Sequence, residues 1–212
     1  MLHKETVEPE LLNLATDLIK IPGLKQFVLV GGTAISLLIG NRKSIDIDLF
    51  SIDSFETDYI LTTLKDHGLK FTVQSMSKGA ILGYIGTIKT DFIRHNYPWI
   101  EAPLKTEGVT LASLKDLAAM KLNAIVGSGA RLKDFIDVAF LSTHFSLSEM
   151  LDFYEIKYPD INGLMAMKSL CYFEDIDFSV DIEYIGRRRS WEEVKNRLTQ
   201  LVSDPDKHFP PF

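Results

Sequence analysis

The sequence contains a single cysteine, Cys171, among its 212 residues. One cysteine can form neither an intramolecular disulfide nor a zinc site built from several thiolates. No stretch approaches the roughly 20 apolar residues that a membrane-spanning helix needs. The first eight residues are charged and have no apolar run of the kind found in signal peptides. We therefore expect a soluble protein of a reducing cytoplasm that does not associate with membranes.

Positive charge is also scarce, since 23 Lys and Arg face 29 Asp and Glu and give a formal net charge of −6. The chain lacks the global positive field of a protein that coats nucleic acid, so non-specific binding is expected to be weak. RNA is not excluded as a substrate, because a local basic patch can serve. The length allows one large domain or two small ones, each with its own core.

The first half of the chain alternates helical and strand patterns. Helical spacing begins at Pro9 and is stopped by Pro22. A short helix is predicted at 34–39, directly after Gly31-Gly32-Thr33, and a capping-box pattern from Asp53 to Glu56 begins another. Strands are predicted at 27–30, 45–50, 69–74, 80–85 and 88–94, the last two forming a hairpin near Gly86.

After Pro103 the pattern becomes helical. Ser146 and Ser190 begin capping boxes, and helical periodicity covers 113–126, 132–143, 147–158, 163–172 and 191–202. These patterns predict an α+β fold, in which a mixed sheet with flanking helices is followed by a helical C-terminal half. The expected domains are an α/β domain at 1–103 and a helical domain at 104–212 that completes a cleft.

Asp46 and Asp48 form the first candidate site. They are two residues apart on a predicted strand, so both carboxylates project from one face while Ile47 projects from the other. Two adjacent carboxylates repel each other unless a cation lies between them, and hard oxygen ligands suit Mg²⁺ or Mn²⁺. Alone, this pattern is also that of a solvated acidic strand end.

The Gly31-Gly32-Thr33 turn shortly upstream favours the functional interpretation. Its glycines let the backbone approach a ligand closely, and the N-terminus of the following helix presents N–H groups to an anion. The Thr33 hydroxyl can cap the helix or donate to a phosphate oxygen. A phosphate-binding turn and a carboxylate pair a few residues apart are what nucleoside triphosphate chemistry requires.

Gly31-Gly32-Thr33 with Asn41-Arg42-Lys43-Ser44-Ile45-Asp46-Ile47-Asp48-Leu49-Phe50 resembles the first motif of polymerase-β-type nucleotidyltransferases, most closely the AbiEii/AbiGii toxin branch. The segments 116–125, around Lys121, and 133–137, Lys133-Asp134-Phe-Ile-Asp137, resemble that branch's third and fourth motifs. The segments 170–175 and 191–195 are similar to its C-terminal region. The resemblance implies a nucleotidyltransferase fold for the sheet half.

The resemblance also assigns roles to charged residues outside the first motif. Asp91, on a predicted strand, would be the third metal carboxylate and would activate the attacking hydroxyl; a solvent-facing hairpin aspartate is the alternative. Lys121 would bind the triphosphate, where charge neutralisation matters most. A lysine that extends its ammonium from an apolar helix to solvent is the alternative there.

Asp137 would orient Lys121, the nucleotide or the acceptor according to the same resemblance. Lys133 is four residues earlier on the same predicted helix, and the pair could equally be a surface ion pair. Arg42 and Ser44 precede the acidic pair and could face the nucleotide, Arg42 through a phosphate and Ser44 through the metal-bound NTP.

These residues predict an enzyme that moves a nucleoside monophosphate from an NTP to an acceptor hydroxyl with Mg²⁺ or Mn²⁺. The resemblance implies a tRNA 3′ end as acceptor in some members, or protein hydroxyls in other nucleotidyltransferases, and a toxin role with a cognate antitoxin. Two alternatives stay open. One is modification of a small molecule of the antibiotic type, and the other is a catalytically silent nucleotide-binding module.

Overall fold

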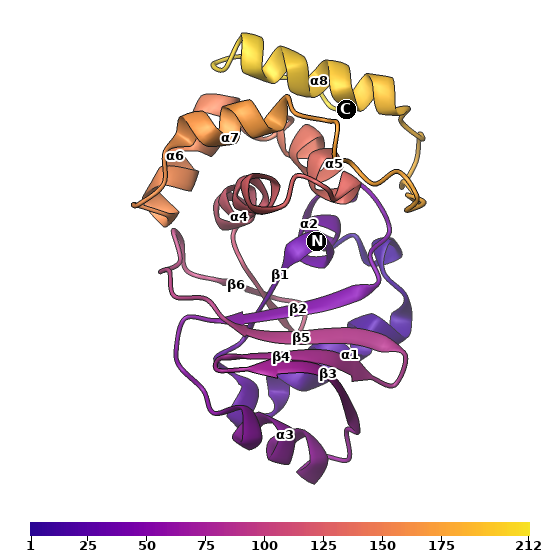
Figure 1. The fold of residues 1–212 in the computed structure, drawn as a ribbon. Coiled ribbons are helices and arrows are strands. Elements are labelled where there is room, and N and C mark those ends of the chain that lie inside the picture. Colours follow the sequence, from indigo (N-terminus) through magenta and orange to yellow (C-terminus); the bar gives the residue numbers. More distant parts are fainter. The chain divides into compact units, whose positions relative to one another are not determined.

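The structure is a computed structural model that describes all 212 residues. By their internal contacts the residues form two compact units. Unit 1 comprises Met1–Gly40 and Ser44–Ser113, and unit 2 comprises Asn41–Lys43 and Leu114–Phe212. Figure 1 labels most elements of both units.

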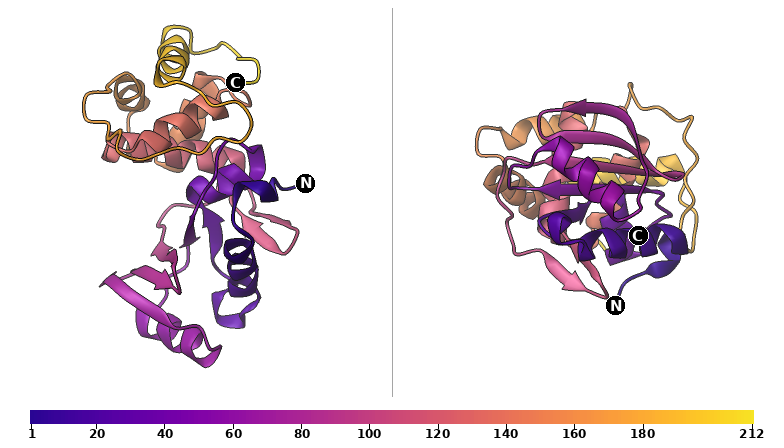
Figure 2. Two further views of the ribbon diagram at one scale, coloured as in Figure 1. Left: turned by 90° about the vertical axis from the view of Figure 1, so that its right-hand side faces the viewer. Right: turned by 90° about the horizontal axis from the view of Figure 1, so that it is seen from below.

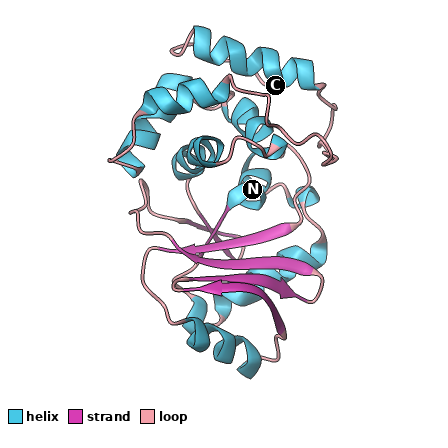
Figure 3. Ribbon diagram, in the orientation of Figure 1, coloured by secondary structure: helices cyan, strands magenta, loops and turns pink.

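Unit 1 is built on one seven-stranded mixed sheet (Figure 3). The strand order is β3-β4-β5-β2-β1-β7-β6. The pairs β2–β5 and β1–β7 are parallel, and the other neighbours are antiparallel. The strands are β1 (Val28–Val30), β2 (Asp46–Ser51), β3 (Phe71–Ser77), β4 (Ala80–Ile85), β5 (Ile88–Arg94), β6 (Leu104–Thr106) and β7 (Val109–Leu111).

Three α-helices and two short 3₁₀ helices complete unit 1. They are α1 (Pro9–Lys20), α2 (Gly31–Ile39) and α3 (Thr57–Asp66), with η1 (Lys4–Thr6) and η2 (Pro22–Leu24). Helix α1 packs against β7 and β2, α2 against β1 and β2, and α3 against β3. Phe27 makes edge-to-face contacts with Phe55 and Phe92 beneath the sheet, and Phe27 and Phe92 are fully buried.

Unit 2 contains the helices predicted for the second half. They are α4 (Leu114–Gly127), α5 (Leu132–Leu141), α6 (Leu147–Lys157), α7 (Gly163–Leu170) and α8 (Trp191–Ser203). Helix α4 contacts α5, α6 and α7, while α8 packs on α5 and α7. The predicted capping boxes at Ser146 and Ser190 are confirmed, with Glu149 and Glu193 completing them. None of the helices in the chain has the length and apolar character needed to cross a membrane.

Asn41–Lys43 belong to unit 2 because their backbone pairs with the segment before α8. The Lys43 N–H donates to the Glu183 carbonyl at 2.7 Å, and the Ile185 N–H donates to the Asn41 carbonyl at 3.2 Å. Arg42 and Tyr184 form an isolated antiparallel bridge. The chain therefore passes between the units after Gly40, after Lys43 and after Ser113.

Two local predictions were wrong, and one hairpin was not predicted. Helix α2 begins at Gly31 rather than at residue 34, so the glycines form its first turn. The Asp53–Glu56 capping box does not form, because Asp53 is held in a turn by the Ser51 hydroxyl and α3 begins at Thr57. The β6–β7 hairpin was not predicted; its turn has Glu107 and Gly108 at positive φ, and Figure 2 shows it beside α1.

Candidate active site

Asp46 and Asp48 lie on one face of β2, as the alternation of the sequence predicts. Ile47 and Leu49 point to the opposite face and are fully buried, whereas Asp46 and Asp48 are half-buried. The burial of the apolar residues fixes the register, because a slip by one residue would bury the carboxylates instead. Both carboxylates are therefore presented together at a partly accessible surface.

Asp91 lies beside this pair on the neighbouring strand. In the parallel pairing of β2 with β5, Asp48 is opposite Asp91 and Asp46 is opposite Lys89. Directly paired residues project on the same side of a sheet, so all four side chains share one face. We call Asp46, Asp48, Lys89 and Asp91 the β2–β5 charge cluster.

Lys89 is the only cation of the β2–β5 charge cluster. Its ammonium is 2.8 Å from Asp91 Oδ2, while the Gly83 N–H donates to Asp91 Oδ1 at 3.3 Å. Burial alone would lower the pKa of Lys89, but the hydrogen bond and charge of Asp91, followed by the charges of Asp48 and Asp46, raise it overall. The ammonium is therefore charged and lies in the field of three carboxylates. Lys89 was not predicted as a site residue, although its spacing of two from Asp91 predicts that both lie on one strand face.

The N-terminus of α2 lies against Asp48. Gly31 has φ of 69°, and a Cβ atom built on it would be 2.3 Å from Asp48 Oδ2. Only glycine fits this position without moving the carboxylate. No side chain caps α2, and the first N–H groups of a helix carry a partial positive charge that suits an anion. Gly32 follows Gly31 in this first turn.

The hydroxyl groups of Thr33 and Ser44 connect α2 to the start of β2. They are 2.8 Å apart, and Thr33 also donates to the Asp46 carbonyl oxygen. Thr33 is 1% exposed and Ser44 is 7% exposed. Both hydroxyls thus hold the backbone of Asp46 in place within unit 1.

In unit 2, Asp137 lies at the centre of a second group of charges. It is fully buried, on α5. Arg42 binds it through two hydrogen bonds, Nε to Oδ1 and Nη2 to Oδ2, each 2.8 Å long. Asn41 Nδ2 adds a third at 2.9 Å. This bidentate geometry is the strongest arrangement available to an arginine and a carboxylate.

Lys121, on α4, belongs to the same group. Its ammonium is 2.6 Å from Asp134 Oδ1 and 2.9 Å from Asp137 Oδ2. We call Asn41, Arg42, Lys121, Asp134 and Asp137 the Asp137 cluster. Asp134 was missed as a site residue, although its spacing of three from Asp137 places both on one face of α5.

The charges of the Asp137 cluster stabilise one another against burial. Burial opposes ionisation of Asp137, but Arg42 and Lys121 lower its pKa to about 2. Burial likewise opposes the charge of Lys121, but Asp137 and Asp134 raise its pKa. Lys133 is half-buried on α5 and is not a partner of Asp137. The i, i+4 surface pair that the spacing allowed does not form.

The carboxylates of the β2–β5 charge cluster are oxygen ligands of the kind that bind divalent metals. No group of three or more His, Cys, Asp or Glu side chains in the chain is placed to hold a metal ion. Asp91 is instead bonded to Lys89 and Gly83. The ammonium nevertheless shows that a cation is stabilised at this face, and carboxylate oxygens are the ligands that Mg²⁺ and Mn²⁺ prefer. The chemistry of these carboxylates suits such an ion, but their placement in this structure does not form a metal site.

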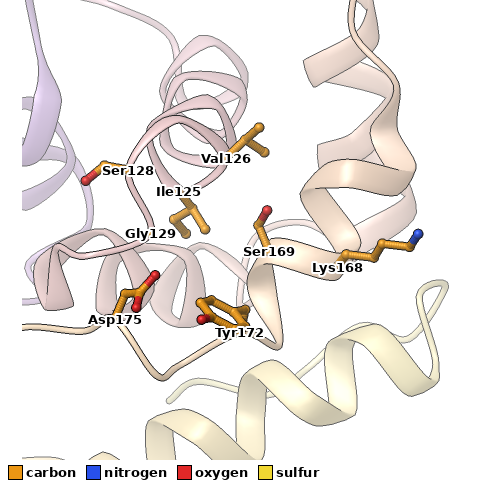
Figure 4. A pocket seen from close by; sticks show the side chains of 8 residues that line it. All are labelled: Ile125, Val126, Ser128, Gly129, Lys168, Ser169, Tyr172 and Asp175. Atoms are coloured by element: carbon orange, nitrogen blue, oxygen red, sulfur yellow. The ribbon is translucent and has the colours of Figure 1, made fainter.

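Two pockets were compared with these residues. In unit 1, a pocket of about 410 Å³ is lined by Asp46 and Lys89 together with Glu8, Glu10 and Tyr84. In unit 2, a pocket of about 340 Å³ lies between the end of α4 and α7, and Figure 4 shows Lys168 extending away from the other labelled side chains. The unit 2 pocket contains none of the predicted site residues. The unit 1 pocket therefore has the stronger claim to function.

The chain is similar in sequence to known proteins. The model of the AbiEii family, described as nucleotidyl transferase AbiEii toxin of a type IV toxin–antitoxin system, matches residues 14–82. The uncharacterised protein aq_aa25 of Aquifex aeolicus (strain VF5) is 34% identical over 187 residues, which is 84% of this chain and 87% of that protein.

Two solved structures from Helicobacter pylori have a similar fold. A candidate nucleotidyltransferase gives a TM-score of 0.54 at 18% identity, over 92% of this chain and 94% of that one. JHP933 gives 0.51 at 18% identity, over 93% and 92%. These likenesses confirm the predicted α+β nucleotidyltransferase fold. The chain belongs to the AbiEii-type nucleotidyltransferase family.

Proposed function

We propose that this protein transfers a nucleoside monophosphate from an NTP to an acceptor hydroxyl. The observation that carries the proposal is the register of β2 with β5, which places Asp48 beside Asp91 on the face that also presents Asp46. The glycine-led N-terminus of α2 lies against the same Asp48 carboxylate. Carboxylates beside an uncapped helix N-terminus supply both the metal ligands and the phosphate donors that the reaction needs.

Asp46, Asp48 and Asp91 would hold Mg²⁺ or Mn²⁺. A metal bound there neutralises phosphate charge and makes the acceptor hydroxyl more acidic. Asp91 is the carboxylate assigned to the acceptor hydroxyl. The Thr33 and Ser44 hydroxyls keep the Asp46 backbone in register and so orient its side chain.

Binding of the triphosphate is assigned to backbone and cationic groups. The N–H groups of Gly31 and Gly32 would bind phosphate oxygens at the start of α2. The resemblance assigns Lys121 to a triphosphate, and Asp134 and Asp137 hold its ammonium in one position. Lys133 pairs with neither Asp134 nor Asp137 and is assigned to the nucleotide. Asp137 is in this proposal a positioning residue, because its own oxygens are already occupied.

The acceptor and the biological role are proposed from the family. A tRNA 3′ end is the acceptor that the resemblance implies, and the description of the matching family implies a toxin with a cognate antitoxin. A net charge of −6 means that RNA would be bound locally rather than by a general positive field.

The decisive test is transfer of α-³²P-labelled NTPs, one base at a time, to total tRNA with Mg²⁺. Asp46→Asn should reduce labelling by roughly a hundredfold or more, because it removes a metal ligand without changing shape. The matched control is Asp66→Asn, an exposed carboxamide replacement at the end of α3. Labelling that survives in Asp46→Asn but not in heat-denatured protein would contradict the mechanism.

A small-molecule acceptor is the second candidate, and the unit 1 pocket favours it. Glu8, Glu10 and Asp46 line this pocket together with Lys89. Such a lining repels phosphates and suits a hydroxyl group on a positively charged molecule. Replacing tRNA with an aminoglycoside in the same assay separates the two acceptors. Calorimetry with NTP and Mg²⁺ tests the third alternative, a silent nucleotide-binding module.

A further inference from the structure

The segment between α7 and α8 forms one wall of another pocket in unit 2. Figure 1 shows this segment leaving α7, passing α5 and returning to α8. The Asp177 N–H anchors it by donating to the Ala130 carbonyl at 2.9 Å. The pocket has a volume of about 210 Å³, and we call it the 178–191 pocket. Its charged and aromatic lining residues are Phe178, Asp181, Tyr184, Arg188, Arg189 and Trp191.

Two arginines of the 178–191 pocket are not held in close ion pairs. The Nε atom of Arg189 is buried and has no hydrogen-bond partner, and its guanidinium is 5.2 Å from the centre of the Phe212 ring. Arg188 is 3.8 Å from Asp181, and these two side chains are 82% and 92% exposed. Such a long and exposed ion pair contributes little stability. Both guanidiniums therefore have binding capacity left for an anion.

Aromatic and apolar surface lies beside these guanidiniums. Phe178 is 53% exposed and Val180 is 40% exposed. The Phe178 ring lies 5.3 Å from the Trp191 ring, at an interplanar angle of 71°. Phe135 and Phe173 make edge-to-face contacts with Trp191 and so hold it in place. The pocket thus presents an accessible aromatic ring on a rigid support.

This combination of groups selects one class of ligand. Guanidinium groups bind phosphate oxygens, and aromatic rings stack on the bases of unpaired nucleotides. An acidic protein segment would satisfy the arginines but leave the exposed ring without a stacking partner. The lining has two guanidiniums and one carboxylate, that of Asp181. Its charge therefore favours an anion, although the whole chain is acidic.

We propose that the 178–191 pocket binds one nucleotide of a single-stranded RNA segment, with Arg188 and Arg189 at the phosphate and Phe178 against the base. The inference deepens the proposed transfer to RNA and rests on it for its role in the cell. Because the formal net charge is −6, binding is local, and each of the two arginines should account for a measurable share of it.

Fluorescence anisotropy of a fluorescein-labelled oligoadenylate, with the full chain in EDTA and without NTP, measures this binding apart from transfer. Arg188→Gln and Arg189→Gln should each weaken binding roughly threefold to tenfold. Each should also reduce the slope of log Kd against log salt concentration by about 0.7, because one phosphate contact is lost. The matched control is Arg187→Gln, which should change neither quantity, because Glu193 already pairs with that guanidinium.

Phe178→Ala tests the aromatic part of the pocket. It should weaken binding by roughly tenfold, because a stacked base is lost, and it should leave the salt slope unchanged. Phe178 and Arg188 are both exposed, so these two variants are expected to fold, and an unchanged Tm checks this. The Arg188 and Phe178 variants therefore keep the proposal testable even if Arg189→Gln loosens the contact with Phe212.

Three results would overturn the inference. They are no binding of oligoadenylate by the wild type, an equal loss in Arg187→Gln and Arg188→Gln, and displacement of the RNA by polyglutamate as readily as by unlabelled oligoadenylate. Each would mean that the pocket does not recognise a nucleotide. Labelling of tRNA by protein that fails this binding test would leave the proposed function standing. Binding that depends on Arg188 and Phe178 without any labelling of RNA would contradict the proposed function alone.

Discussion

The chain contains two groups of charged side chains that differ in balance and burial. In the β2–β5 charge cluster, Lys89 shares a sheet face with Asp46, Asp48 and Asp91 and pairs with Asp91, and the lysine side chain is 38% exposed. In the Asp137 cluster, Arg42 and Lys121 balance two carboxylates, and their side chains are only 2% and 10% exposed. One cluster has an excess of negative charge near solvent, and the other is neutral and enclosed.

The difference separates an accessible group of charges from an enclosed one. A buried pair of charges is costly to form and very costly to break, so its geometry is kept fixed. An accessible group with excess negative charge attracts an additional cation and can exchange it. The β2–β5 charge cluster is therefore the more accessible of the two, while the Asp137 cluster holds Lys121 in place.

The largest expected effect comes from removing one carboxylate charge from the buried Asp137 cluster. Asp137→Asn leaves the charges of Arg42 and Lys121 enclosed with one carboxylate, which should lower the free energy of unfolding of unit 2 by about 3–5 kcal/mol. Urea unfolding followed by Trp191 fluorescence measures it, in a Trp99→Phe background so that the signal comes from unit 2 alone. The chain has two tryptophans, Trp99 in unit 1 and Trp191 in unit 2, so replacing Trp99 leaves only the unit 2 signal.

The control for Asp137→Asn is a pair of the same chemistry at the surface. Asp17 and Lys20 are each 65% exposed and 2.9 Å apart, so Asp17→Asn should change stability by less than about 1 kcal/mol. A loss in Asp137→Asn as small as that would mean that the cluster is hydrated and flexible in solution.

Much of the fold was predictable from the sequence because it depends on local patterns. The alternation around Ile47 and Leu49 fixed β2, and the capping boxes at Ser146 and Ser190 identified two helix starts. The β6–β7 hairpin escaped because its strands have three residues each, too few for an alternating pattern to register. Its pairing with β1 is a long-range contact that no local signal encodes.

The candidate site was predictable only where it is local. Asp46, Asp48 and Gly31 lie within 18 positions of one another, and the structure brings Gly31 against Asp48. The pairing of Arg42 with Asp137 spans 95 residues, and spacing along the chain cannot reveal it. The sequence therefore gave the types of charge, whereas their partners required the three-dimensional fold.

The next largest effect concerns the close approach of α2 to Asp48 of the β2–β5 charge cluster. Gly31→Ala must adopt a φ of 69° and place a methyl group 2.3 Å from Asp48 Oδ2. We expect a loss of roughly 2–4 kcal/mol in unit 1, of which about 1–2 kcal/mol is the left-handed backbone and the rest is displacement of Asp48. Trp99 fluorescence during urea unfolding, in a Trp191→Phe background, measures this loss.

Gly86→Ala is the matched control for Gly31→Ala. Gly86 has φ of 61°, but no atom lies within 4 Å of the position of its Cβ. It should therefore cost only the backbone part, about 1–2 kcal/mol. Equal losses in the two variants would show that Asp48 is not crowded by α2. In that case the helix N-terminus would not restrict the carboxylate.

The smallest expected effect is the loss of stability in acid that comes from protonation of Asp137. Because the pKa of Asp137 is lowered from its ordinary 3.8 to about 2, its contribution to stability is complete above about pH 4 and is lost as the pH falls through 2. The expected loss for unit 2 is on the order of 2 kcal/mol, read from Trp191 fluorescence in urea at each pH. Asp17→Asn should leave this acid profile unchanged, whereas Asp137→Asn should flatten it between pH 4 and 2. A wild-type profile already flat in that interval would mean that Arg42 and Lys121 do not hold Asp137 in solution, and the contrast between the two clusters would disappear.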